Sequence, residues 1–267
     1  MSGINIRMKR FFRESSGKTV IFPLDHGVTC GPILGIENLA TTMRWGVEAG
    51  ADAFVLHKGM FDIAATVPGL KQGLFLHVSG STQLGRAVNR KVPVSSVEEA
   101  IRRGADGVSC HINLANPDEP EMIRDLGILS DACFKWQMPL LVMIYIRGSY
   151  ANEVDRDQAT VHAVRLAAEL GATIIKTSCP SSQKYMEKLV QVSHVPVVLA
   201  GGAKVSNEKE LLNRIHEAMK CGIHGVAVGR NVFQHSNPVL FLKAILGIVH
   251  EEMSPQEAWD MLVSAGE

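Results

Sequence analysis

The sequence lacks the long apolar run that a membrane-spanning helix needs, because no such run reaches about 18 residues. Its 27 basic and 27 acidic side chains balance, so nothing suggests a nucleic-acid or membrane surface. The five cysteines are an odd number without a C-x-x-C pair, which argues against a disulfide framework. No continuous apolar stretch follows the charged start, so the start does not look like a secretory signal. These absences predict a soluble, cytoplasmic protein.

The chain also lacks low-complexity segments and any linker rich in proline, glycine or serine. Its 267 residues could form two small domains, but α/β barrels of about 250 residues are common as one domain. With 46% hydrophobic residues, the chain can bury a large core. We therefore expect a single domain over residues 1–267, and a homo-oligomer as the working form.

One sequence pattern recurs along the chain. An amphipathic segment ends in a glycine, and a short apolar run follows, as in LAAELGATIIKT (166–177). Glycine can close a helix in the left-handed conformation, and a run of apolar or small residues indicates a strand buried on both faces. The other instances are WGVEAGADAFVLH (45–57), AIRRGADGVSCH (100–111) and AMKCGIHGVAVG (218–229), with proline-led variants at 138–145 and 195–202.

Strands therefore alternate with helices, which predicts a parallel sheet with helical crossovers. Eight strands favour closure into a (β/α)₈ TIM barrel, with a doubly wound open sheet as the alternative. The crossover at 58–73 has the weakest helical pattern. The expected strands are 19–24, 53–57, 74–78, 107–111, 140–145, 173–177, 195–200 and 225–229. The expected helices lie near 37–49, 96–104, 119–136, 157–170, 182–192, 207–220 and 238–250.

Polar residues follow the apolar part of each expected strand, where the chemistry of a barrel collects. Taken singly, a histidine there more often satisfies a neighbour at the rim, but the whole set indicates a site. The set is Asp25, His26, His57, Lys58, His77, Ser79, His111, Asn113, Tyr145, Arg147, Lys176, Gly201, Gly202, Gly229 and Arg230.

Lys176 is the most informative member, because it follows two isoleucines at the end of a buried strand. Such a lysine either pairs with a carboxylate such as Asp25 or has its ammonium destabilised, which a carbonyl-attacking amine requires. Gly201-Gly202 and Gly229-Arg230 precede helices after the last two strands, a common place for phosphate.

A metal site is the competing chemistry. The four strand-end histidines, with Asp25, could hold a metal, but no H-x-H or H-E-x-x-H spacing supports it. Cys30 and Cys179 lie near the expected site without a paired base, so we expect them to be spectators. We predict neither a metal nor a cofactor.

At this point the sequence resembles a known family, the archaeal type of class I fructose-bisphosphate aldolase together with the 2-amino-3,7-dideoxy-D-threo-hept-6-ulosonate synthases. The resemblance covers nearly the whole chain in order. It rests on FPLDHGVTCGP (22–32), LHKG (56–59), HVSGST (77–82), EEAIRRGADGVSCHIN (98–113), IYIRG (144–148), IIKTS (174–178), VLAGGAK (198–204) and GVAVGRNVFQH (225–235).

The resemblance implies a TIM barrel and a metal-independent Schiff-base mechanism on a phosphorylated keto sugar and an aldehyde. It places the Schiff base on Lys176, the proton donor on Tyr145, and a proton acceptor or substrate ligand on Asp25. It implies further substrate contacts at His26, Gly27, Val28, Thr29, Ile146 and Arg147, and a phosphate cradle of Gly201, Gly202, Gly229 and Arg230.

Within the family, the segments LDHGVTCGP, LHKG and GRNVFQH look closer to the synthase branch, which uses aspartate semialdehyde as acceptor. Fructose-bisphosphate cleavage is the alternative. A departure is Ile146, where many members have proline. Lys58, Arg86 and Arg147 are the candidate ligands for an anionic group of the acceptor. A non-catalytic sugar-phosphate-binding protein is a third interpretation, but Asp25, Tyr145 and Lys176 together argue against it.

Overall fold

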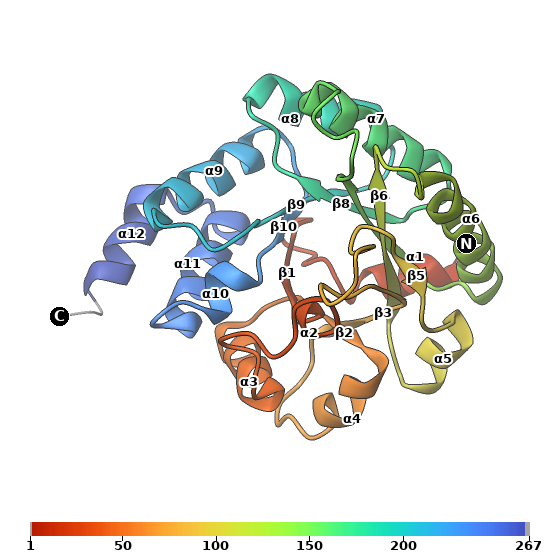
Figure 1. The fold of residues 1–267 in the computed structure, drawn as a ribbon. Coiled ribbons are helices and arrows are strands. Elements are labelled where there is room, and N and C mark those ends of the chain that lie inside the picture. The colour runs from red at the N-terminus through yellow and green to blue at the C-terminus, as the bar shows by residue number, and fades with distance from the viewer. Residues whose placement is uncertain (1, 265–267) are drawn as a thin grey trace.

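The computed structural model describes residues 2–264. Its centre is a closed barrel of eight parallel strands in the order β1-β2-β3-β6-β7-β8-β9-β10, with β10 pairing back to β1 (Figure 1). This confirms the TIM barrel and excludes the open sheet. The barrel strands are β1 (Thr19–Pro23), β2 (Ala53–His57), β3 (Gly73–His77), β6 (Gly107–Leu114), β7 (Leu140–Ile146), β8 (Ile174–Ser178), β9 (Val197–Ala200) and β10 (Gly225–Ala227).

Helices surround the barrel, and each expected helix is found. These are α3 (Leu39–Ala49), α5 (Val97–Arg102), α6 (Glu119–Trp136), α7 (Arg156–Glu169), α8 (Gln183–Val192), α9 (Glu208–Lys220) and α11 (Pro238–His250). The sequence patterns did not indicate α1 (Ser2–Met8), α2 (His26–Cys30), α10 (Arg230–Phe233), α12 (Pro255–Ser264) and a hairpin of β4 (Ser79–Gly80) and β5 (Val92–Pro93). The weak crossover after β2 holds only η1 (Lys58–Met60) and α4 (Phe61–Ala64).

Local signals fix the helix ends. The Asn38 side chain accepts a hydrogen bond from the Thr41 N–H and so caps the start of α3. Gly50 ends the same helix in the left-handed conformation, with φ +88°, and its N–H donates to the Gly46 carbonyl. The glycine that was expected to close this helix therefore does so, and the chain turns directly into β2.

The inside of the barrel is filled from its N-terminal end. The Phe11 ring, from the segment before β1, is fully buried and stacks on Phe75 with ring centroids 3.8 Å apart. Ile21, Val55 and Ile174 pack in the same inner cluster. Fully burying a phenylalanine contributes about 1.5–3 kcal/mol. Because apolar side chains fill the barrel interior at this end, a polar cavity can open only at the opposite end.

The barrel closes where the first strand meets the last. Thr19, Val20 and Ile21 of β1 align with residues 225–227 of β10. The backbones approach so closely that a Cβ on Gly225 would lie 2.0 Å from the Thr19 carbonyl oxygen. Glycine is therefore required at this point of the closure. In the described part of the chain, no helix is long and apolar enough to cross a membrane.

Candidate active site

A cavity of about 370 Å³ opens at the C-terminal ends of the strands. Residues from distant parts of the sequence, many of them predicted site residues, line this cavity. The predicted residues that line it are Asp25, His26, Thr29, Tyr145, Arg147, Lys176, Gly201, Gly202, Gly229 and Arg230. His57, His77, Ser79, His111 and Asn113, predicted at the strand ends, also line it.

Three residues of the predicted substrate-binding set, Gly27, Val28 and Ile146, are not among the lining residues. Ile146 follows Tyr145 on β7, and alternate side chains of a strand point to opposite faces. Its side chain therefore packs outward against the helices. Val28 lies on α2 and is 40% exposed. The roles of these three residues stay predictions.

Lys176 lies near the end of β8, and only 6% of it is exposed. Its side-chain nitrogen donates a weak hydrogen bond to the Met143 Sδ, at 4.0 Å. Among the described residues, no carboxylate forms a salt bridge with it, so the structural ion pair with Asp25 is absent. An amine without a fixed partner remains free to meet a carbonyl group in the cavity.

Asp25 follows β1 and faces the same cavity. Its Oδ1 lies 3.7 Å from His26 Nδ1, and its Oδ2 lies 3.9 Å from His77 Nε2. Burial raises the pKa of Asp25, but His77, His26, Lys176 and His57 outweigh burial and hold the pKa below its usual range. Asp25 is therefore an ionised carboxylate near neutral pH, and its side chain faces the cavity.

The histidines of the cavity have the opposite tendency. Burial lowers the pKa of His26 and of His57, although Asp25 opposes it in both, and lowers the pKa of His77 to about 3. Burial also holds the pKa of His111 well below its usual value. These rings are neutral near pH 7, so they serve as hydrogen-bonding groups there rather than as cations.

Tyr145 is held from two sides. The His111 ring meets it edge-on with centroids 4.9 Å apart, and the Arg147 guanidinium lies 4.3 Å from the ring centroid. The His111 Nε2 lies 2.9 Å from the Asn113 Oδ1, and the Asn113 Nδ2 donates to the Asn89 carbonyl. Asn113 therefore fixes the His111 ring, which in turn packs against Tyr145.

The two glycine loops come together at the end of β9 and β10. The backbone N–H groups of Gly202, Gly229 and Arg230 have no acceptor within residues 2–264, and the Arg230 Nε is buried without a partner. Unpaired donors of this kind suit an anion such as phosphate. A Cβ on Gly229 would lie 2.8 Å from the His26 Cε1, so this loop also needs glycine.

Asn231 joins these two loops, and the sequence patterns did not identify it. Its Nδ2 donates to the carbonyls of Gly201 and Ala203, at 2.8 and 3.0 Å, and its Oδ1 accepts from the Val205 N–H at 2.8 Å. Only 1% of the residue is exposed. In the sequence, only its position directly after Arg230, a predicted phosphate ligand, could have pointed to Asn231.

The predicted acceptor ligands Lys58 and Arg86 do not line the cavity, whereas Arg147 does. Lys58 donates instead to the Val94 carbonyl at 2.8 Å. A lysine that the sequence analysis missed, Lys91, takes that place next to Arg147. Its ammonium donates to Ser81 Oγ at 2.5 Å, and burial, then Arg147, lowers its pKa. Lys91 precedes the short β5, outside the barrel strands, so strand-end analysis could not find it.

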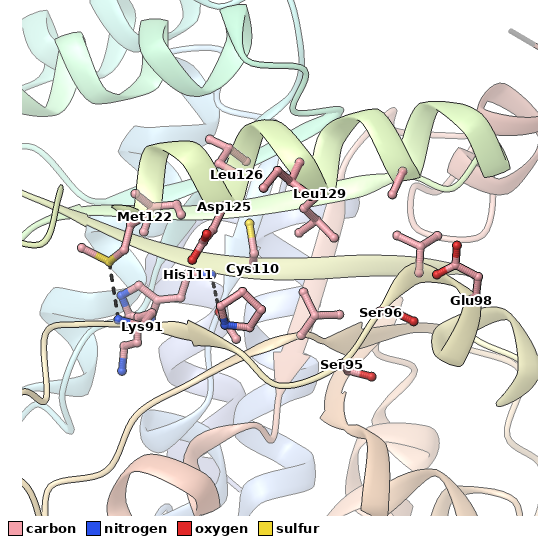
Figure 2. A pocket seen from close by; sticks show the side chains of 17 residues that line it. Lys91, Ser95, Ser96, Glu98, Cys110, His111, Met122, Asp125, Leu126 and Leu129 are labelled. Carbon is pink, nitrogen blue, oxygen red and sulfur yellow. Dashed lines mark hydrogen bonds between the residues drawn. The ribbon is translucent and has the colours of Figure 1, made fainter. Parts of the chain in front are cut away.

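Two further cavities adjoin the site. One of about 410 Å³ lies beside the β9 loop and shares Tyr145, Arg147 and Gly202 with it. Cys179 lines this second cavity, and burial raises the pKa of its thiol. The other, of about 300 Å³, lies between α6 and residues 91–98. Figure 2 shows Lys91 and His111 at one end of it and Glu98 at the other.

The histidines and Asp25 do not form a metal site. Across residues 2–264, no group of three or more His, Cys, Asp or Glu side chains is arranged to hold a metal ion. The metal-dependent alternative therefore has no geometric support in this part of the chain.

Comparison with known proteins identifies the family. Residues 19–235 match the model of the DeoC/LacD family aldolases. The chain belongs to this aldolase family. It is 41% identical over 261 residues to 2-amino-3,7-dideoxy-D-threo-hept-6-ulosonate synthase 1 of Archaeoglobus fulgidus, covering 97% of this chain and 96% of the relative. The chemistry expected from the sequence, that of an aldolase, is confirmed at this level.

Two further relatives span the same length. A Streptomyces griseus protein, 2-amino-4,5-dihydroxy-6-oxo-7-(phosphonooxy)heptanoate synthase, is 36% identical over 247 residues, or 92% of this chain and 90% of the relative. A solved archaeal fructose-1,6-bisphosphate aldolase has its catalytic lysine covalently bound to the carbinolamine intermediate of the substrate. It is 29% identical, with a TM-score of 0.83 over 92% of this chain and 99% of that one.

Proposed function

We propose that this aldolase forms a Schiff base between Lys176 and a phosphorylated ketose, and joins the derived fragment to an aldehyde as the hept-6-ulosonate synthases do. The observation that carries the proposal is the buried Lys176 amine, which has no carboxylate partner and faces a cavity with unpaired N–H donors. The lysine-bound carbinolamine of the archaeal relative supports the same chemistry.

Each step has a group in the cavity to perform it. The Lys176 amine attacks the ketone carbon, a proton reaches the carbonyl oxygen, and loss of water leaves an imine. Breaking the bond between the α and β carbons of this imine gives an enamine and an aldehyde, as a base takes the proton of the hydroxyl group on the β carbon. Tyr145 supplies the proton for water loss, and Asp25 accepts the hydroxyl proton. The reverse steps join the enamine to a new aldehyde.

The substrate phosphate binds at Gly201, Gly202, Gly229 and Arg230. The free N–H groups and the buried Arg230 guanidinium support this assignment, because each charge-assisted hydrogen bond contributes about 1.5–3 kcal/mol. Phosphate bound at this edge leaves the sugar carbons to extend across the barrel mouth toward Lys176.

The synthase branch is favoured over fructose-bisphosphate cleavage by the higher identity of the synthase relatives, 41% and 36%, against 29% for the solved aldolase. Arg147 and Lys91 suit either acceptor, because a carboxylate and a phosphate both pair with cations. Asp25 is the one carboxylate that lines the cavity within the described chain, and it would be the partner of an acceptor ammonium.

Borohydride trapping tests the proposal directly. Reduction during incubation with a ketose phosphate should leave a covalent adduct on Lys176, located by peptide mass spectrometry, and none in Lys176→Met. An adduct on Lys58 or Lys204 instead would refute the assignment. Consumption of aspartate semialdehyde with that donor would support the synthase branch, and fast cleavage of fructose 1,6-bisphosphate would support the alternative.

Two finer expectations belong to the same proposal. The five free cysteines suit a reducing compartment, so we place the enzyme in the cytoplasm. We also expect a homo-oligomer, which sedimentation of the purified protein would measure.

A further inference from the structure

His77 lies beside Asp25 but has a second partner on the far side of its ring. Its Nδ1 lies 2.8 Å from the hydroxyl oxygen of Ser109, and its Nε2 lies 3.9 Å from the Asp25 Oδ2. His77 and Ser109 are aligned partners on the neighbouring strands β3 and β6. Only 4% of His77 and none of Ser109 is exposed. The three side chains therefore form a row, Ser109–His77–Asp25, from the barrel wall to the cavity.

The ring of His77 is neutral near pH 7, so it carries one proton, on either Nδ1 or Nε2. With the proton on Nδ1, the lone pair of Nε2 would face the negative Asp25 carboxylate. With the proton on Nε2, an N–H faces that carboxylate, and the Ser109 hydroxyl donates to Nδ1. The second arrangement satisfies every group in the row, whereas the first sets a lone pair against an anion.

Ser79 fits the same arrangement. Its hydroxyl oxygen lies 3.4 Å from His77 Nε2 and accepts a hydrogen bond from the His111 N–H at 2.8 Å. An N–H on Nε2 therefore points between the Ser79 oxygen and the Asp25 oxygen. At 3.9 Å the contact with Asp25 is electrostatic rather than a hydrogen bond, and such contacts commonly shorten when substrate binds.

We propose that Ser109 is a positioning residue that fixes His77 with its proton on Nε2, and that this N–H orients the Asp25 carboxylate toward the Lys176 adduct. The part played by Asp25 rests on the proposed function, whereas the tautomer of His77 does not. Ser109 touches neither Asp25 nor the cavity, so it acts only through the histidine.

The other charged groups around the row set its pH response. Asp25 is faced by His77, His26, Lys176 and His57, and His77 is faced by Asp25, His57, Lys176 and Lys91. An N–H directed at a carboxylate stabilises its ionised form and lowers its pKa. His77 has a pKa of about 3, so it carries an N–H on both nitrogens only in strong acid. The choice of tautomer therefore acts on Asp25 near neutral pH, where the variants are compared.

Nitrogen NMR of histidine in the unaltered protein measures the tautomer without substrate. The Nε2 of His77 should carry the proton and the Nδ1 should have the shift of an unprotonated nitrogen, with the signals assigned by their absence in His77→Gln. A proton on Nδ1 would overturn the proposal. In Ser109→Ala the preference for Nε2 should weaken, because nothing then donates to Nδ1.

Kinetics test the consequence. At neutral pH, Ser109→Ala should lower kcat on the order of tenfold and change the KM for the ketose phosphate little. Thr177→Val is the matched control, because it also removes a buried strand hydroxyl, one that donates to the Ile144 carbonyl away from Asp25. Its kcat should fall much less than that of Ser109→Ala.

The possible failures can be separated. If Ser109→Ala and Thr177→Val lower kcat equally, or if Ser109→Ala leaves the tautomer of His77 unchanged, the role of Ser109 in positioning is refuted. If borohydride traps no adduct on Lys176 in the unaltered protein, the proposed function fails, whereas the NMR result for His77 still stands. Recovery of kcat and of the proton on Nε2 in Ser109→Thr, which restores a hydroxyl donor, would strengthen the assignment.

Discussion

Two partly buried aspartates, Asp52 and Asp25, lie at opposite ends of the barrel and differ in their partners. The Asp52 carboxylate accepts from the Val20 N–H at 2.6 Å, from Arg13 Nε at 2.7 Å, and lies 2.8 Å from His250 Nε2. The Asp25 carboxylate has no direct hydrogen bond within residues 2–264, and its nearest histidine nitrogens are 3.7 and 3.9 Å away.

The difference distinguishes a carboxylate that stabilises the fold from one that is available to a substrate. At the N-terminal end, both carboxylate oxygens of Asp52 have partners, so Asp52 ties the N-terminal segment and α11 to the barrel. At the C-terminal end, Asp25 keeps free oxygens that face a cavity, which a core residue would not do without cost. The two ends thus differ in whether the carboxylate is held by direct hydrogen bonds or faces a cavity with free oxygens.

Removing the carboxylate at each end in turn should give the largest and most contrasting effects. Asp25→Asn should lower kcat by about 10³-fold or more, because a base is lost, with little change in stability. Asp52→Ala should lower the free energy of unfolding by about 3 kcal/mol, because His250 and Arg13 lose their buried partner, with a near-normal kcat. Urea unfolding and steady-state kinetics of both variants would measure this.

A stable, inactive Asp52→Ala protein, or an active, unstable Asp25→Asn protein, would contradict the assignment of roles to the two ends.

A substitution of Tyr145 tests the proposed proton donor at the C-terminal end of the barrel. Tyr145→Phe keeps the ring that His111 and Arg147 contact but removes the hydroxyl, so the fold should be intact. We expect kcat to fall by about 10²–10⁴-fold, the usual contribution of one positioned acid. A near-normal single-turnover rate would instead leave water or a histidine as the proton donor.

The phosphate ligand should affect binding more than rate. Arg230→Met should raise the KM for the ketose phosphate by about 10- to 100-fold, the equivalent of one charge-assisted hydrogen bond. Lys58→Met is the control, because Lys58 is also a cation near a strand end but binds the Val94 carbonyl outside the cavity. Equal effects of the two substitutions would show that net charge, rather than a specific contact, attracts the substrate.

The smallest effect is expected at the edge of the structural network. The Ser16 hydroxyl lies 2.7 Å from His250 Nδ1. Ser16→Ala should lower the free energy of unfolding by about 1 kcal/mol, the usual net value of one hydrogen bond, and leave kcat and KM unchanged. Thermal unfolding alongside activity would measure it, and a kinetic change would link the two ends of the barrel.

The fold was predictable because each barrel strand is an apolar run that follows a glycine or proline signal, as at Gly50 before β2. Side chains at the ends of such strands meet by topology alone, which is why Lys176, Tyr145 and Asp25 could be assigned to one site. The family resemblance supplied their separate roles, which periodicity does not encode.

Other residues of the core and the site could not be identified from local sequence patterns. Phe11 fills the bottom of the barrel from a segment without strand periodicity, and Lys91 reaches the cavity from the hairpin crossover rather than from a barrel strand. Ser109 lies in mid-strand, where a serine is ordinarily only a small buried residue. These contacts depend on how the crossovers fold back, which local sequence patterns do not determine.

The closure of the barrel has a consequence for biosynthesis. Strand β1 pairs with β2 on one side and with β10 on the other. The edge of β1 that faces β10 therefore stays unpaired until residues 225–227 have been synthesised and folded. A nascent chain therefore leaves the ribosome with an apolar strand edge open until most of its length has been translated. Such an edge is a template for pairing with other chains, so expression at low temperature or with a chaperone should improve the soluble yield.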